Sequence, residues 1–373
     1  MMADRIRIGI IFGGRSGEHE VSLMSARSVL SVLDPQKYAV TQIGITHDGA
    51  WVCGDNVLDA LQAGAIDALQ PAAILPDPRR PGFFGLAPAQ GGDLLKLLTG
   101  LDVVFPVLHG TFGEDGTLQG LLELADLPYV GAGVLGSAVG MDKALFKDVM
   151  RTHRIPVVES ITLTRRQIQA SIEKALALAE SVAPYPLFIK PANLGSSVGV
   201  SKVHSHSDLL EGLLEAARFD RRVLVERGID AREIEVSVLG NEEPVASLPG
   251  EVIPSDEFYS YRAKYIDETS ELIIPAKVSD SMVAALKDYA VRAFKAIDCA
   301  GMARVDFLLE RGTDAIFVSE INTIPGFTRI SMYPKLWQAS GISYPELIHK
   351  LVDLALERKA DRDHTERRYG RAA

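Results

Sequence analysis

The chain has 373 residues, of which 47% are hydrophobic and 24% charged, and this composition is typical of a globular protein with two or three domains. A formal net charge of −10 argues against non-specific nucleic-acid binding and against affinity for anionic membranes. Cys53 and Cys299 have no CxxC or metal-ligand spacing, which argues against a disulfide scaffold and predicts a cytoplasmic location. The apolar run at residues 6–12 is too short for a signal peptide or a membrane span.

The N-terminal segment predicts the start of a doubly wound α/β domain. A strand at residues 5–12 precedes a glycine-rich turn at 13–17 and a helix at 18–33. Further strands are expected at residues 39–45 and 103–108. The glycines at 13, 14 and 17 do not form the GxGxxG fingerprint, so a dinucleotide-binding dehydrogenase is the weakest interpretation.

Two polar residues follow strands of this predicted sheet. Because ligands bind at the carboxyl ends of strands in open α/β sheets, Glu18 and His109 lie where a small substrate would bind. A capping or loop role is an equally good interpretation of each residue. Residues 55–92, between the predicted strands, are rich in Ala, Gln and Pro, and we expect an excursion there that says little about function.

The next segment predicts a phosphate-binding loop. After the glycine-rich residues 131–140, we expect helices at 141–151, 165–181 and 208–219 and strands at 187–190 and 223–226. Lys190 ends a strand and precedes a loop of small residues, whose backbone N–H groups and hydroxyls suit phosphate oxygens. The P-loop spacing is absent, and a purely structural Gly-Ser turn is the alternative.

A third region begins near residue 230. Strands are expected at 233–239 and 249–254, a lid loop at 255–269 and a helix at 280–297. Ser343 and Pro345 predict the start of a last helix, and the charged tail after Glu357 predicts a frayed end.

Residues 303–309 and 315–321 predict a β-hairpin with a polar face. Alternation puts Arg304 and Asp306 on one face, with Asp306 opposite Glu320 and Asn322 beside it. The other face is expected to be buried, and it carries Val305, Phe307, Phe317 and Ile321. Carboxylate and amide oxygens at this density suit Mg²⁺. A solvated face with one surface ion pair is the alternative.

The chain resembles the D-alanine–D-alanine ligase family of the ATP-grasp superfamily. The resemblance rests on eight segments in the family's order, GGRSGEHEVS, HGTFGEDGTLQGLLELADLPYVG, MDK, IKPANLGSSVGVSKV, AKYIDE, ARVDF, EINTIPGFT and SMYPKL. It implies an α/β, ATP-grasp fold with a Rossmann-like N-terminal domain at 1–140, a central domain at 141–229 and a C-terminal domain at 230–373. ATP would lie between the last two domains.

The resemblance also implies roles for individual residues. The implied metal ligands are Asp306, Glu320 and Asn322. The implied ATP-binding residues are Lys143, Lys190, Ser196, Ser197, Glu226, Arg227, Ile229, Glu233 and Lys264. The implied substrate-binding residues are Glu18, His109, Arg304, Asn322, Gly326, Ser331 and Met332. The implied catalytic residues are Glu18, Ser196, Tyr265, Arg304 and Gly326, with Tyr265 hydrogen-bonded to Glu18 and Ser196.

The implied reaction joins two D-alanines through a D-alanyl phosphate and converts ATP to ADP and phosphate, for peptidoglycan synthesis. The resemblance further implies two Mg²⁺ or Mn²⁺ ions, a homodimer, and no nucleic-acid or membrane partner. The nearest rival activity is that of a ligase that joins D-alanine to D-lactate. Our hypothesis is that Tyr265 marks the dipeptide enzyme and so argues against this rival. An ATP-grasp ligase for a different carboxylate and a nucleotide-binding regulator without catalysis are two more rival interpretations.

Overall fold

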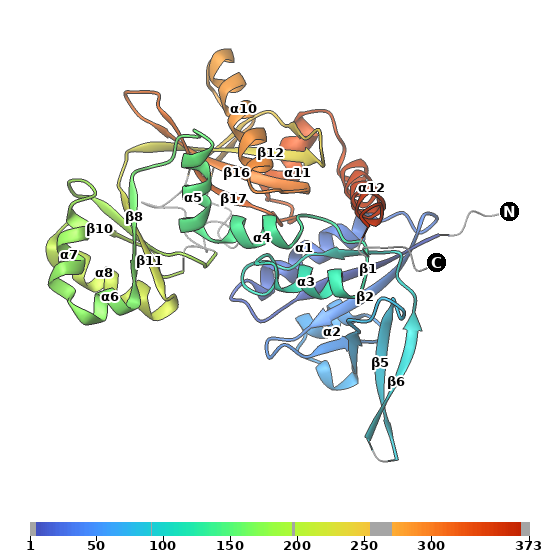
Figure 1. Ribbon diagram of the computed structural model, residues 1–373. Helices are drawn as coiled ribbons and strands as arrows, with labels where there is room; N and C mark the ends of the chain where they lie inside the picture. Colours follow the sequence, from blue (N-terminus) through green and yellow to red (C-terminus); the bar gives the residue numbers. More distant parts are fainter. Residues whose placement is uncertain (1–4, 91, 196–197, 254–270, 367–373) are drawn as a thin grey trace.

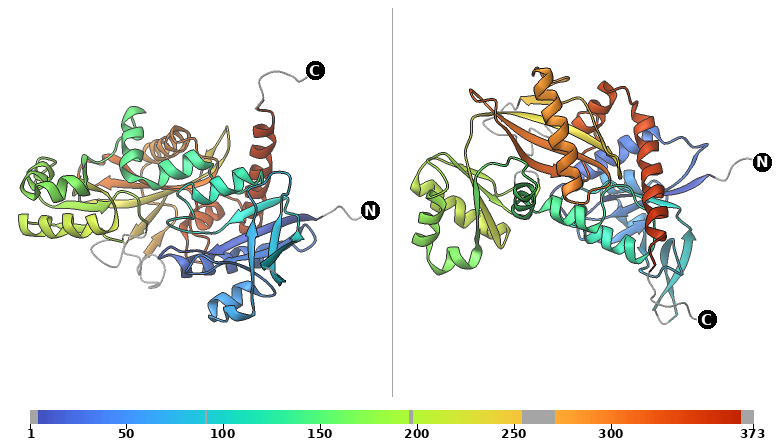
Figure 2. Two further views of the ribbon diagram at one scale, coloured as in Figure 1. Left: turned by 60° about the horizontal axis from the view of Figure 1, so that its bottom comes forward. Right: turned by 45° about the horizontal axis from the view of Figure 1, so that its top comes forward.

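A computed structural model describes residues 5–90, 92–195, 198–253 and 271–366 of the chain. In these ranges three β-sheets are arranged as an N-terminal, a central and a C-terminal group (Figures 1 and 2). No helix in the described ranges has the length and hydropathy needed to span a bilayer.

The N-terminal sheet has a parallel part and an antiparallel part, in the order β6-β5-β4-β3-β2-β1-β7. Strand β1 (Ile6–Gly13) pairs in parallel with β2 (Tyr38–Ile45) and β7 (Val103–Pro106). Helix α1 (His19–Val32) packs on one face, and α3 (Thr117–Leu124) packs on the other. The predicted doubly wound arrangement is therefore present around β1.

Residues 55–92, where we expected an excursion, extend this sheet. The segment contains α2 (Val57–Gln62), a 3₁₀ turn at Ile66–Ala68 and strands that pair antiparallel. The strands of this antiparallel part are β3 (Trp51–Cys53), β4 (Gln70–Ile74), β5 (Phe83–Ala89) and β6 (Gly92–Thr99). β5 is buried at its start and exposed at its end, and β6 is exposed along nearly its whole length, so neither strand shows the alternation that predicts a half-buried strand.

The central sheet is antiparallel, in the order β10-β9-β11-β8, and has its own hydrophobic core. Its strands are β8 (Ser160–Thr164), β9 (Leu187–Pro191), β10 (Ser201–Val203) and β11 (Arg222–Arg227). Its helices are α6 (Arg165–Ala170), α7 (Ile172–Glu180) and α8 (His206–Phe219). The single helix expected at 165–181 is thus two helices, because Ser171 has extended backbone angles and precedes α7 as its N-cap.

The C-terminal sheet is also antiparallel, and α10 (Asp280–Ala296) packs against it. Its strands are β12 (Ala231–Gly240), β13 (Val245–Ala246), β14 (Gly250–Ile253), β15 (Glu271–Ile273), β16 (Gly301–Glu310) and β17 (Ile316–Asn322). Helices α4 (Val134–Met141) and α5 (Lys143–Thr152) join the N-terminal and central sheets (Figure 1). Phe146 and Met150 of α5 are buried in the core of the C-terminal sheet.

Helix α12 (Tyr344–Asp363) lies beside the N-terminal sheet, far from it in sequence (Figure 1). Its buried face shares one hydrophobic core with β1, β7 and α1, and α11 (Met332–Ala339) also contributes to that core. The expectation of a frayed end after Glu357 was wrong up to Asp363. Lys359 lies 3.5 Å from Asp126, and Arg362 pairs with both Asp126 and Glu123 of the N-terminal part.

Candidate active site

The predicted polar face of the hairpin β16–β17 is present in the expected register. Asp306 lies opposite Glu320, and Arg304 lies opposite Asn322. Arg304 donates hydrogen bonds of 2.7 and 2.6 Å to the two carboxylate oxygens of Asp306. The Asn322 amide donates to Asp306 Oδ2 at 3.1 Å. Because the side chains of Arg304 and Asp306 are only 12% and 16% exposed, the alternative of a solvated surface ion pair does not hold.

The predicted core face of this hairpin was wrong at Phe317. A β-bulge interrupts the ladder after Asp306, so that Phe307 pairs with Val318 and Leu308 pairs with Phe317. The extra residue reverses the alternation of β17, which buries Val318 and turns Phe317 to the polar face. There the Arg227 guanidinium lies 5.6 Å from the centre of the Phe317 ring.

A cavity of about 530 Å³ lies between the central and C-terminal sheets. This volume is within the range of roughly 300–1,000 Å³ that is typical of small-molecule sites. Its wall includes every predicted ATP-binding residue that the structure describes, namely Lys143, Lys190, Glu226, Arg227, Ile229 and Glu233. Ser196, Ser197, Lys264 and Tyr265 lie outside the described residues.

Lys143 is positioned by the start of α5. Asp142 caps the helix by accepting a hydrogen bond of 2.9 Å from the Leu145 N–H, and it also pairs with Arg222. The ammonium of Lys143 donates to the Leu194 carbonyl at 2.7 Å and lies 3.3 Å from Glu320 Oε2. This lysine therefore joins the glycine-rich loop of the central sheet to the polar face of the hairpin.

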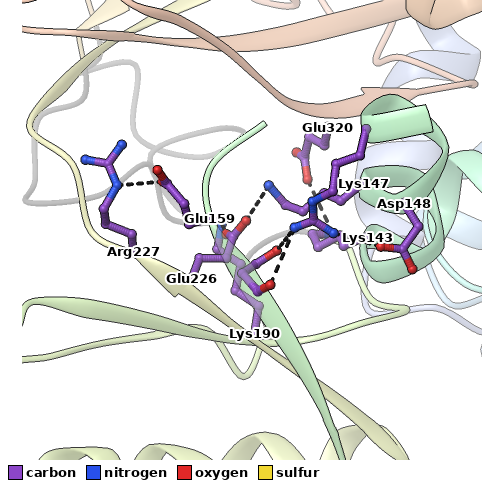
Figure 3. A network of polar contacts seen from close by, with 10 residues as sticks. Lys143, Lys147, Asp148, Glu159, Lys190, Glu226, Arg227 and Glu320 are labelled. Carbon is purple, nitrogen blue, oxygen red and sulfur yellow. Dashed lines mark hydrogen bonds and ion pairs between the residues drawn. The ribbon is translucent and has the colours of Figure 1, made fainter. Parts of the chain in front are cut away.

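Glu226 is held between two lysines (Figure 3). Lys147 Nζ lies 2.5 Å from Glu226 Oε1, and Lys190 pairs with Glu226 Oε2. Burial opposes ionisation of Glu226, but the two ammonium groups lower its pKa to about 2. Burial would lower the pKa of Lys190, but the attraction of Glu226 outweighs it and the pKa is raised. Burial does lower the pKa of Lys147.

Arg227 bridges two sheets at the edge of the large cavity. Its Nε donates to Glu159 at 2.7 Å, and its Nη1 donates to Glu310 at 2.8 Å. Figure 3 shows the contact with Glu159. The side chain thus connects the end of β11 with β16 and positions the cavity wall.

A second, smaller and polar pocket adjoins the large cavity. It is lined by Glu18, His109, Arg304, Asn322 and Gly326, which are five of the seven predicted substrate-binding residues, and also by Glu114, Lys143 and Glu320. Lys143 and Glu320 line both spaces. The predicted nucleotide and amino-acid sites are therefore contiguous.

Close packing around Glu18 explains why two neighbouring positions, 110 and 195, are occupied by glycine. A Cβ on Gly195 would lie 2.8 Å from Glu18 Oε2, and a Cβ on Gly110 would lie 2.4 Å from the same oxygen. Gly110 also has a φ of +72°, which glycine adopts without strain. The Glu18 carboxylate is thus enclosed by the N-terminal part and by the loop that follows β9.

His109 is buried with both ring nitrogens paired. Nδ1 lies 3.1 Å from the Ile324 carbonyl, and Nε2 lies 3.1 Å from Ser25 Oγ. Burial, reinforced by the charge of Arg304, lowers the pKa of His109 to about 4. The ring is consequently neutral at physiological pH, and it connects α1 to the loop after β17.

Sequence reasoning missed Glu114 and Lys147 as site residues. Burial and the nearby charge of Glu18 raise the pKa of Glu114, whose Oε1 accepts a hydrogen bond of 2.7 Å from the Gly110 N–H. Lys147 lies one helical turn after Lys143, and this spacing was the available signal, because residues i and i+4 share a helix face. No comparable local pattern marks Glu114.

Ser331 and Met332 are not brought into the described lining of either space. Ser331 Oγ accepts from the Thr328 N–H at 3.0 Å, and Met332 is 3% exposed in an apolar cluster with Val252 and Leu336. Their substrate-binding roles remain predictions from the resemblance.

The donor set of the hairpin fits a divalent cation. Asp306, Glu320 and Asn322 offer only oxygen ligands, as Mg²⁺ and Mn²⁺ prefer. In the structure Arg304 pairs with Asp306, and Lys143 pairs with Glu320. These two side chains supply positive charge to the carboxylates, as a bound cation would.

Two family models match the chain. The D-ala D-ala ligase N-terminus model matches residues 7–132, and the D-ala D-ala ligase C-terminus model matches residues 149–353. The chain belongs to the D-alanine–D-alanine ligase family. The ATP-grasp fold that the sequence predicted is thereby confirmed.

Known ligases resemble the chain over nearly its whole length. A D-alanine–D-alanine ligase of Heliobacterium modesticaldum is 49% identical, with 96% of this chain and 98% of that protein covered. The structure of the D-alanine-D-alanine ligase from Coxiella burnetii has a TM-score of 0.81 at 38% identity and covers 97% of each chain. The structure of the VanG D-Ala:D-Ser ligase from Enterococcus faecalis has a TM-score of 0.83 at 34% identity, with 94% of this chain and 100% of that chain covered.

Proposed function

We propose that this ligase joins two molecules of D-alanine to D-alanyl-D-alanine and converts ATP to ADP and phosphate, for peptidoglycan synthesis. The observation that carries the proposal is the contact of the two spaces at Lys143 and Glu320. A phosphoryl group at the end of a nucleotide in the large cavity would reach an amino-acid carboxylate in the polar pocket there. Family membership and the names of the relatives support the same reaction.

In the first step, the carboxylate of one D-alanine attacks the γ-phosphorus of ATP. A C–O–P linkage forms, and the bond from that phosphorus to the β,γ-bridging oxygen breaks, which releases ADP. We assign the ammonium of this D-alanine to Glu18, and the phosphates to Lys143 and Lys190. These lysines counter the charge that spreads over the transferred phosphoryl oxygens.

In the second step, the free amine of another D-alanine attacks the acyl carbon. The C–N bond forms, the C–O bond to phosphate breaks, phosphate leaves, and the attacking nitrogen loses a proton. Arg304, held by Asp306 and Glu235, and the Gly326 N–H are assigned to the negative oxygen of the tetrahedral intermediate. We assign the carboxylate of the second D-alanine to Ser331.

The proposal includes two Mg²⁺ or Mn²⁺ ions at Asp306, Glu320 and Asn322. When bound, they would supply Lewis-acid neutralisation of phosphate charge. We also propose that the protein is a cytoplasmic homodimer. We further propose the domain division 1–140, 141–229 and 230–373, and the presence of one sheet in each range supports this division.

The test is phosphate release from ATP and Mg²⁺ with D-alanine, L-alanine, D-alanine plus D-lactate, or D-alanine plus D-serine, with products identified by mass. We expect phosphate and D-alanyl-D-alanine with D-alanine and no product with L-alanine. D-serine is included because the VanG relative is a D-Ala:D-Ser ligase. A mixed product formed in preference to the dipeptide would overturn the proposed second substrate, and no product in any reaction would overturn the proposal.

A further inference from the structure

One buried carboxylate faces two ammonium groups in the wall of the large cavity. Glu226 on β11 contacts Lys147 of α5 through one oxygen and Lys190 of β9 through the other (Figure 3). The side chains of Lys147 and Glu226 are only 2% and 5% exposed. Two ammonium groups thus share one carboxylate, and Lys147 and Glu226 are the two members that lie away from solvent.

The two lysines differ in what else they can reach. Lys190 lines the large cavity, whereas Lys147 does not belong to the described lining. Lys147 is also fixed in place, because its helix is capped by Asp142 and anchored in the core by Phe146 and Met150. Of the two lysines, Lys190 is therefore the one that borders the cavity, and Lys147 is the one buried against Glu226.

Binding of a polyphosphate requires Lys190 to exchange one anion for another. When Lys190 turns to a phosphate, Glu226 loses one of its two cations. A buried carboxylate without a cation is strongly unfavourable, so Glu226 without Lys147 would retain Lys190. With Lys147 in place, Glu226 keeps a counter-ion throughout the exchange.

We propose that Lys147 is a positioning residue for nucleotide binding, the permanent counter-ion of Glu226 that releases Lys190 to the phosphates of ATP. The inference rests on the proposed function only in taking ATP as the ligand. It assigns no contact between Lys147 and the nucleotide, so its effect must pass through Glu226.

The experiment measures binding of the non-hydrolysable analogue AMP-PNP with Mg²⁺ by calorimetry, without any amino acid. We expect Lys147→Met to weaken binding by about tenfold or more, whereas Lys147→Arg, which keeps the cation, stays within about threefold. The exposed Lys295→Met on α10 serves as the matched control and is expected to bind as the unmodified chain does. Thermal unfolding of each variant shows whether it is folded.

The decisive readout is the dependence on Glu226. In a Glu226→Gln background no buried carboxylate needs a counter-ion, so adding Lys147→Met should change the affinity by less than about threefold. A merely structural role of Lys147 would weaken binding in both backgrounds. Should Lys147→Met alone fail to fold, Lys147→Gln, which also removes the cation, takes its place in both backgrounds.

Equal affinity of the unmodified chain and Lys147→Met would overturn the inference and leave the proposed function intact. A loss of affinity on adding Lys147→Met to Glu226→Gln would also overturn it, because Lys147 would then act without Glu226. Absence of AMP-PNP binding by the unmodified chain would overturn both the inference and the proposed function.

Discussion

Lys143 Nζ lies 3.3 Å from Glu320 Oε2, where the large cavity meets the polar pocket. The pairing brings a cation from the start of α5 to a carboxylate at the end of the C-terminal hairpin. Phosphoryl transfer needs a positive group on the phosphate and an anchor for a metal ion at one point, and we propose that this pair supplies both.

Replacement of Lys143 tests the role of this lysine where the large cavity meets the polar pocket. Lys143→Met removes a cation from the proposed phosphate site, and we expect kcat/KM for ATP to fall by roughly 100-fold or more. The measurement is steady-state phosphate release at varied ATP. Lys295→Met, an exposed lysine of α10, is the control and should leave kcat/KM unchanged. Activity of Lys143→Met near that of the control would remove Lys143 from the phosphate site.

Arg304→Lys separates charge from geometry at the reacting carbon. Lysine keeps the charge but cannot make the two parallel hydrogen bonds that Arg304 makes to Asp306. We expect kcat to fall by roughly 100-fold, whereas the affinity for AMP-PNP changes by less than about threefold. Steady-state kinetics and calorimetry provide the two values. A loss confined to nucleotide affinity would contradict the role assigned to Arg304.

Gly195→Ala tests the enclosure of Glu18. The added Cβ would lie 2.8 Å from Glu18 Oε2, so the carboxylate must move. We expect the KM for D-alanine to rise by about tenfold with nearly unchanged AMP-PNP affinity. Gly120→Ala is the matched control, because a Cβ there meets nothing within 4 Å. Unchanged KM for D-alanine in Gly195→Ala would show that this contact does not position Glu18.

His109 predicts a pH dependence of stability. Its folded pKa is about 4 and its ordinary value is 6.5, so between these values the unfolded chain binds more protons than the folded chain. Stability therefore falls as pH decreases from 6.5 to 4, and this histidine contributes up to about 3 kcal/mol of that loss. The contribution is fully present above pH 6.5.

The measurement is urea unfolding between pH 4 and 7. We expect His109→Gln to have a shallower pH slope than the unmodified chain, because the variant lacks this proton uptake on unfolding. His364→Gln, at an exposed position near the end of α12, should keep the original slope. Identical slopes for His109→Gln and the unmodified chain would mean that the imidazole is not buried in its neutral form.

The sequence predicted the elements whose periodicity is strong, and it predicted the polar face of β16–β17, because alternation is a local property. The bulge after Asp306 is not visible locally, and this is why Phe317 was assigned to the wrong face. Burial that depends on distant segments was also missed. Glu114 acquires its environment from Glu18, almost a hundred residues earlier in the chain, and Lys147 acquires its partner from β11.

The tail after Glu357 shows the same limit. Its charged residues suggested a solvated end, but Lys359 and Arg362 find acidic partners more than 230 residues earlier. The strands within residues 55–92 were not predicted for a different reason. β5 is buried at its start and exposed at its end, so it lacks the alternation that reveals a strand.

The hydrophobic core that α12 shares with β1, β7 and α1 has a consequence for synthesis of the chain. Leu347, Ile348, Leu351 and Val352 share this core with Ile8, Ile10 and Phe105, which are translated long before them. At roughly 5–20 residues per second, the part of the sheet face in this core that α1 does not cover stays open for tens of seconds until α12 has been made. The nascent chain therefore exposes an apolar surface that chaperones would bind until α12 has been made, and the core of the N-terminal sheet is complete only then.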